Sequence, residues 1–132
     1  MIATTVEQSR HLAELGIPKE SADMIWKYYR DEDGKVKYYD LANVSFGYYS
    51  GIAIPAWSLS ALLEFMPPCL KGDNNESYFF ALEKDSYDDG KIVYDACYAN
   101  WDGLIKMSYL KGNNPIEAAY KMVVWLKENN KI

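Results

Sequence analysis

The chain has 132 residues, of which 25% are charged and 49% hydrophobic, and its formal net charge is −5. This length predicts a single domain over residues 1–132, which buries roughly two-thirds of its unfolded surface on folding. The negative charge excludes non-specific binding to nucleic acid, because the basic residues are scattered singly among acids. No apolar run approaches the roughly 20 residues that a membrane span needs.

The N-terminal segment predicts a helix that begins at Thr4 or Thr5. Thr4 with Glu7, and Thr5 with Gln8, both fit a capping box, in which two side chains bond the first unpaired backbone amides. Gly16 suits the left-handed conformation that ends many helices. We therefore expect a short first helix that stops just before Gly16.

Residues 24–41 predict a β-hairpin, because two tyrosine doublets flank an Asp-Gly dipeptide at 33–34. A turn centred on that dipeptide gives three cross-strand pairs: Tyr29 with Tyr38, Tyr28 with Tyr39, and Lys27 with Asp40. Aromatic and opposite-charge pairs of this kind hold an antiparallel ladder in register. Residues 42–56, which include Tyr48 and Tyr49, fit either a third strand or an aromatic loop.

Residues 57–66 predict a second helix, with Ser58 as its N-cap and a Pro-Pro dipeptide at 67–68 as its end. A second hairpin is expected over residues 77–100, turning at the Asp-Gly dipeptide at 89–90. A turn centred there pairs Lys84 with Asp95, Leu82 with Cys97, Phe80 with Ala99, and Tyr78 with Trp101. This register gathers on one inward face Tyr78, Phe80, Leu82, Val93, Cys97 and Trp101.

Residues 104–110 predict a further strand, and the last segment predicts the clearest helix. Asn114 is its cap, Pro115 its first residue, and Glu117 completes the capping arrangement. Its apolar arc is wider than one sheet can cover. Met122 and Trp125 therefore require cover from the second helix or from a second copy of the chain.

Together these elements predict an α+β fold. We expect a mainly antiparallel sheet built from two hairpins and one further strand, with three helices packed on one face. Two Asp-Gly turns placed among three capped helical segments are the basis of this prediction.

No residue pattern predicts a catalytic, cofactor or metal site. His11 is the only histidine, and Cys69 and Cys97 lie far apart in the sequence, whereas metal sites need clustered ligands. The acidic segments 31–34 and 85–90 resemble calcium loops, but neither has the EF-hand spacing. We therefore expect no cofactor, no metal and no enzymatic activity.

Two stretches, Trp57–Pro67 and Asn114–Asn129, are similar to segments of small uncharacterised proteins encoded in prophages and conjugative elements of gut Bacteroides-type bacteria. The first helix and the strand-rich middle resemble those proteins in layout, so the likeness covers most of the chain. Both stretches are helix-packing patterns, and the group has no established activity or binding residues. The resemblance implies an α+β fold and an accessory role in a mobile genetic element.

These observations favour a non-catalytic accessory or protein-interaction domain, whose partner is an unidentified protein or a second copy. The alternative is a small-ligand binder with an aromatic cleft, and the third reading is an enzyme of unknown type. A cytoplasmic location is expected, because the first residues lack the basic start and apolar stretch of a secretory signal. The candidate ligand or interaction surface consists of Tyr48, Tyr49, Trp57, Trp101, Met122 and Trp125.

Overall fold

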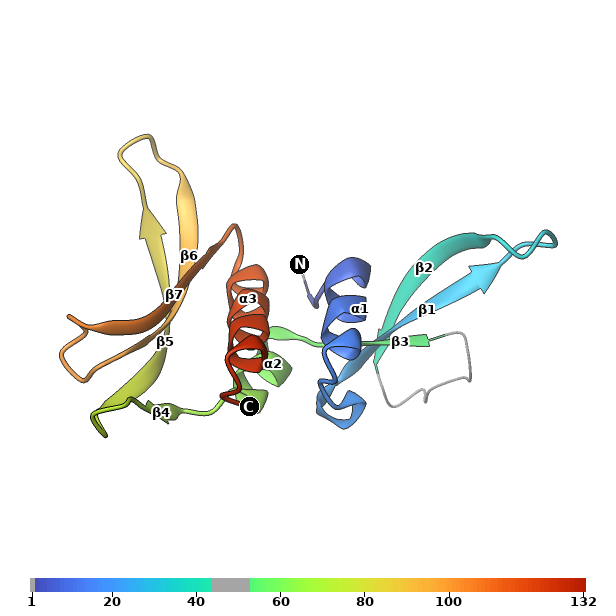
Figure 1. Ribbon diagram of the computed structural model, residues 1–132. Coiled ribbons are helices and arrows are strands. Elements are labelled where there is room, and N and C mark those ends of the chain that lie inside the picture. The colour runs from blue at the N-terminus through green and yellow to red at the C-terminus, as the bar shows by residue number, and fades with distance from the viewer. Residues whose placement is uncertain (1, 44–52) are drawn as a thin grey trace. The chain divides into compact units, whose positions relative to one another are not determined.

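The computed structural model describes residues 2–43 and 53–132 (Figure 1). The chain forms two compact units, an N-terminal unit of residues 2–61 and a C-terminal unit of residues 62–132. A single domain over residues 1–132 stays a prediction. The elements are α1 (Val6–Glu14), a 3-10 turn (Lys19–Ser21), β1 (Met24–Arg30), β2 (Val36–Asn43), β3 (Ala53–Ala56), α2 (Leu59–Phe65), β4 (Cys69–Lys71), β5 (Ser77–Ser86), β6 (Ile92–Ala99), β7 (Lys106–Gly112) and α3 (Pro115–Glu128).

The fold is α+β with antiparallel pairing, as predicted. The sequence predicts one sheet, whereas the described strands form two. The N-terminal unit contains a three-stranded sheet in the order β2-β1-β3, and the C-terminal unit a four-stranded sheet in the order β4-β5-β6-β7. Each sheet contains one of the predicted hairpins, β1–β2 in the first and β5–β6 in the second. Of the uncertain segment 42–56, residues 53–56 form β3, which pairs with β1, and residues 44–52 lie outside the described residues.

In the N-terminal unit, α1 begins as predicted, with Thr5 as its N-cap. Gln8 N donates to Thr5 Oγ1 (3.1 Å) and Thr5 N donates to Gln8 Oε1 (3.0 Å), which completes the capping box. Gly16 follows the helix with a φ of 85°. Because the capping signal is local, the sequence was sufficient to locate both ends of this helix.

The predicted pairs of the first hairpin are confirmed, including Lys27 with Asp40. Asp31 N donates to Lys35 O (2.8 Å) and Gly34 N to Asp31 O (3.0 Å), so the loop comprises the three residues 32–34. A β-bulge between residues 29 and 30 then shifts the register by one residue. The bulge restores the pairing that a two-residue turn would have given.

The C-terminal hairpin has the same kind of loop but a different register from the prediction. Tyr87 N donates to Lys91 O and Gly90 N to Tyr87 O, both at 2.8 Å, which makes a three-residue loop of residues 88–90. No bulge is recorded between β5 and β6 to compensate for the extra residue. The predicted register is therefore wrong by one position, and the observed pairs are Phe80 with Tyr98, Ala81 with Cys97, Leu82 with Ala96, and Lys84 with Tyr94.

Because side chains alternate along a strand, this one-residue difference moves each side chain of β6 to the face opposite the predicted one. The prediction placed Cys97 on the same face as Phe80 and Leu82. In the structure Cys97 instead lies across from Ala81, on the other face. Trp101 is not an inward-facing strand residue; it lies in the turn after β6.

The helix α3 packs against β6 and β7 and covers one face of the four-stranded sheet, which we call the helix face (Figure 1). Tyr98 is fully buried there, its ring lies 5.5 Å from that of Phe80, and its hydroxyl donates to Pro67 O (2.6 Å). Met122 of α3 is fully buried, and Ser108 Oγ contacts its Sδ at 3.5 Å. The contact of Met122 is thus with the sheet, and cover from the second helix or from a second copy stays a prediction.

Candidate functional site

The face of the four-stranded sheet that α3 leaves uncovered, here called the far face, carries the most varied chemistry of the C-terminal unit. The pairings of β5, β6 and β7 place on it in alternation, among others, Phe79, Ala81, Glu83, Asp95, Cys97, Ala99, Tyr109 and Lys111. β6 contributes the buried residues Asp95, Cys97 and Ala99, and the neighbouring strands β5 and β7 contribute the more exposed ones.

A buried carboxylate and a buried thiol lie on the central strand of the far face. Asp95 is 3% exposed, and no described residue donates a hydrogen bond to its Oδ1. Its cross-strand neighbours are Glu83 and Lys111. Burial raises the pKa of the Cys97 thiol, against the opposing charge of Lys106, and the carboxylates of Glu83 and Asp95 raise it further. A thiol in this setting stays protonated and is a poor nucleophile.

Tyr109 lies between two lysines on β7. Lys106 Nζ is 4.3 Å from the centre of the Tyr109 ring and Lys111 Nζ is 5.4 Å from it. Partial burial and the neighbouring Asp95 carboxylate raise the pKa of Tyr109. Lys111 Nζ also donates to Tyr87 Oη (2.7 Å), and this bond raises the pKa of Lys111 to about 12. Lys111 therefore carries a positive charge at neutral pH.

The loop between β6 and β7 is held by hydrogen bonds within itself. Asn100 N donates to Ile105 O (2.9 Å), and Ile105 N donates to Asn100 Oδ1 (3.0 Å). Gly103 N donates to Asn100 O (2.9 Å), and Leu104 N donates to Asp102 Oδ1 (3.0 Å). Gly103 has a φ of 76°, which a glycine adopts without steric cost. The loop is thus built by its own polar groups and does not use its large apolar side chains for folding.

These apolar side chains are exposed. Trp101 is 85% exposed, Leu104 82%, Ile105 54%, and Phe79 on the adjoining strand β5 is 47% exposed. We call these four residues the loop cluster. Isolated exposed apolar residues are common on protein surfaces, whereas contiguous apolar patches are typical of interaction sites.

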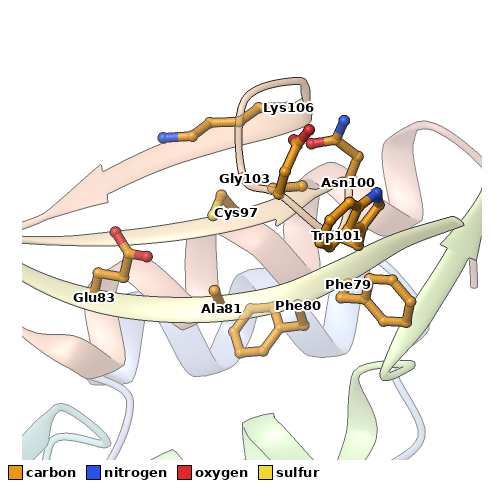
Figure 2. A pocket seen from close by; sticks show the side chains of 11 residues that line it. Phe79, Phe80, Ala81, Glu83, Cys97, Asn100, Trp101, Gly103 and Lys106 are labelled. Carbon is orange, nitrogen blue, oxygen red and sulfur yellow. The ribbon is translucent and has the colours of Figure 1, made fainter.

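A groove of about 510 Å³ runs along the far face beside the loop cluster. Figure 2 shows Phe79 and Trp101 at one end of it and the charged side chains of Glu83 and Lys106 towards the other. Cys97 lies between the two ends. The groove therefore offers an aromatic wall, the carboxylates of Glu83 and Asp102 and the ammonium group of Lys106, and it can accept a flat apolar group or a side chain.

Of the six residues predicted as a ligand or interaction surface, four lie in the described structure, and two of these four are fully buried. Trp57 is fully buried, and its Nε1 donates to Ser21 Oγ (2.9 Å). Met122 is fully buried in the C-terminal unit, and the half-buried Trp125 lines a shallow groove of about 340 Å³ on α3. Trp101 is exposed, whereas residues 48 and 49 lie outside the described residues.

Trp57 is a core residue for reasons that its local sequence does not show. Its backbone N–H donates to Thr4 Oγ1 (3.1 Å) and its carbonyl accepts from Thr4 N (2.9 Å). The Thr4 hydroxyl is itself 2.7 Å from Ser9 Oγ, and both residues are fully buried. This bonding joins the N-terminus to the segment before α2, so Trp57 has no free surface for a ligand.

Sequence reasoning missed Phe79, Leu104 and Ile105. A signal was available for the last two, because they directly follow an Asp-Gly dipeptide at 102–103, which predicts a turn, and turns run over the protein surface. For Phe79 no local signal exists, since its exposure follows from the β5–β6 register.

Comparisons of the chain with protein-family models, with curated proteins and with solved structures find no match. Among residues 2–43 and 53–132, no three His, Cys, Asp or Glu side chains gather in a way that could hold a metal ion. None of the helices in that same part of the chain has both the length and the apolar character to cross a membrane.

Proposed function

We propose that this protein is a non-catalytic protein-interaction domain and that the loop cluster of Phe79, Trp101, Leu104 and Ile105 is its contact surface. The exposure of Trp101 at 85% is the observation that carries the proposal. Burying a large apolar side chain on a partner stabilises a complex by roughly 1.5–3 kcal/mol, and Trp is enriched among the residues that dominate binding.

The internal bonding of the loop supports this function. A loop that is already ordered loses less conformational entropy when it binds, so more of the contact energy contributes to affinity. The hydrogen bonds of Asn100 with Ile105 and Gly103 hold the backbone that bears Trp101 and Leu104. The chemistry of the far face also favours binding over catalysis, because the Cys97 thiol is buried and its pKa is raised.

The biological setting belongs to the same proposal. The resemblance of Trp57–Pro67 and Asn114–Asn129 to proteins of prophages and conjugative elements supports an accessory role in a mobile genetic element. Cys69 and Cys97 are both free thiols, which fits the reducing cytoplasm.

Affinity capture from a lysate of the native host tests the proposal. Immobilised wild-type protein, Trp101→Ala, Leu104→Ala and Ile92→Ala are compared, and each captured protein is identified by mass spectrometry and re-bound as a purified component. Ile92 is the matched control, because it is a 47% exposed aliphatic residue outside the loop cluster. We expect one purified partner to bind wild type and Ile92→Ala, and to bind both loop variants at least ten-fold more weakly, as the loss of about 1.4 kcal/mol or more requires.

Equal binding of that partner to Trp101→Ala, Leu104→Ala and wild type would exclude the loop cluster as the contact surface. Thermal melting of each variant provides the folding control, because truncation of an exposed side chain leaves stability within about 0.5 kcal/mol. Sedimentation of the wild type and of Trp101→Ala shows whether the partner is a second copy of the chain.

A small-ligand binder is the second candidate, and the groove of about 510 Å³ favours it. Ligand sites combine an apolar wall with a few polar groups, as Phe79 and Trp101 do here with Glu83 and Lys106. Titration of the ¹⁵N-labelled protein with aromatic fragments tests this function. Saturable shifts confined to the amides of β5 and β6 would support it, and uniform or absent shifts would rule it out.

A further inference from the structure

A second pocket, of about 220 Å³, lies where three elements of the C-terminal unit meet. The β5–β6 turn, the end of β7 and the first two turns of α3 line it. Its lining residues are Tyr87, Lys91, Val93, Lys111, Gly112, Asn113, Glu117 and Lys121. None of them belongs to the loop cluster, so this pocket and the proposed contact surface are separate.

The pocket is positively charged in a protein whose net charge is −5. Lys91, Lys111 and Lys121 supply three ammonium groups, and Glu117 is the one carboxylate among the lining residues. That carboxylate is already bonded, because Lys121 Nζ lies 3.3 Å from Glu117 Oε1 and the backbone N–H of Asn113 donates to Oε2 (3.1 Å). The lining as a whole thus carries two net positive charges.

The hydrogen bonds in the pocket leave donors available. Lys111 Nζ donates to Tyr87 Oη at 2.7 Å, so the hydroxyl oxygen is used as an acceptor and its own hydrogen remains free to donate. Lys121 Nζ donates to Lys111 O (2.8 Å) and is thereby positioned at the pocket. An ammonium group has three hydrogens, so both lysines retain at least one donor for a ligand.

Protection of a sheet edge explains only one of the three lysines. β7 is an edge strand, and lysines on such strands prevent pairing with other chains, which accounts for Lys111. Lys91 directly follows the β5–β6 turn and Lys121 lies on a helix, where no edge needs protection. Asp88 and Asp89 of the neighbouring turn are not among the lining residues, and Asp89 Oδ1 accepts a hydrogen bond from Lys91 N (2.9 Å).

We propose that the pocket formed by Tyr87, Lys91, Lys111 and Lys121 binds a phosphate group. A phosphate monoester carries close to two negative charges at neutral pH, which match the two positive charges of the lining, and its oxygens accept hydrogen bonds from several directions. Lysine is a common point-charge ligand for phosphate in proteins. The group could belong to free inorganic phosphate or to a nucleotide, and the test separates these two sources.

The test is a titration of the ¹⁵N-labelled full chain, followed by amide chemical shifts, with inorganic phosphate and separately with a nucleoside monophosphate. The variants are Lys91→Gln, Lys111→Gln and Lys121→Gln. Lys84→Gln is the matched control, since it removes the same charge from an exposed lysine of β5 that does not line the pocket. Ionic strength is held constant with sodium chloride, because salt screens exposed charges.

We expect saturable shifts at the amides of Gly112 and Asn113, with affinity reduced roughly ten-fold by each pocket variant and unchanged by Lys84→Gln. Tighter binding of the nucleotide would identify a ligand that extends beyond the pocket, and equal binding would identify the phosphate group alone. The proposal is overturned if the shifts do not saturate, or if Lys84→Gln weakens binding as much as the pocket variants do. Neither result bears on the loop cluster, because partner capture has its own variants.

Discussion

At Gly112 the packing of α3 on the sheet leaves no room for a single added carbon atom. A Cβ added at Gly112 would lie 2.5 Å from the backbone N of Ala118 and 3.0 Å from its Cα. Ordinary contacts of a Cβ begin at 3.4 Å. The opposing atoms are backbone atoms of α3, which cannot rotate away, so Gly112→Ala can fit only if the start of the helix moves off β7.

Such overpacking costs roughly 1–3 kcal/mol, and we expect Gly112→Ala to lower the free energy of unfolding of the C-terminal unit by about 2 kcal/mol. Asn113→Ala is the matched control, because Asn113 is the adjacent, exposed residue and the capping bond at this site uses its backbone N–H. That control is expected to stay within about 0.5 kcal/mol of the wild type. Gly90→Ala separates a steric clash from backbone strain, because Gly90 has a φ of 86° but no atom within 4 Å of an added Cβ.

Amide hydrogen exchange measures the effect in the correct part of the chain, because protection can be followed separately for β6, β7 and α3. A loss of about 2 kcal/mol increases the exchange rate of globally protected amides roughly thirty-fold. Wild-type exchange rates in Gly112→Ala would show that α3 does not approach β7 as closely as the structure has it. Equal losses in Gly112→Ala and Asn113→Ala would also refute the steric argument.

Three further predictions concern the same unit. Met122→Ala should lower the free energy of unfolding, measured by urea denaturation, by about 2–5 kcal/mol, because the side chain is fully buried and its loss leaves a cavity. Trp125→Ala should lower it less, because Trp125 is half-buried. The reverse order would place Trp125 in the core. At pH 8 Cys97 should react with a thiol reagent far more slowly than an unfolded cysteine, because burial raises its pKa and lowers the thiolate fraction. Its reaction should become faster only as the pH rises further. Mass spectrometry of labelled peptides measures this reaction, and rapid labelling of the native protein at pH 8 would contradict the prediction. Tyr98→Phe should lose about 1 kcal/mol in thermal melting, because its hydroxyl bonds a backbone carbonyl at 2.6 Å, and an unchanged melting temperature would show that the bond contributes nothing.

The sequence by itself determined the ends of the helices and the positions of the turns. Thr5 caps α1, Asn114 caps α3 through a 2.8 Å bond from Glu117 N to its Oδ1, and Ser58 Oγ accepts from Ala61 N (3.2 Å) in α2. All of these are contacts between residues three positions apart. A signal of this kind is complete within a few residues, so the rest of the chain is not needed to predict it.

Only the tertiary structure decided the registers of the two hairpins. Both turns are three-residue loops that end in a glycine with positive φ, Gly34 at 81° and Gly90 at 86°. Counting from a two-residue turn gave the correct pairs in the first hairpin because a bulge between residues 29 and 30 compensates for the extra loop residue. It gave incorrect pairs in the second, where the ladder continues without a bulge.

The candidate sites likewise depend on the tertiary structure. The register of β5 and β6 places Phe79 and Cys97 on the far face, and the approach of α3 to Gly112 brings Lys121 to the end of β7 beside Lys111. Residues far apart in the chain meet in both places. Local patterns predict which residues turn or begin a helix, but the pairing of distant strands depends on which side chains can be buried together, and that is a property of the folded chain.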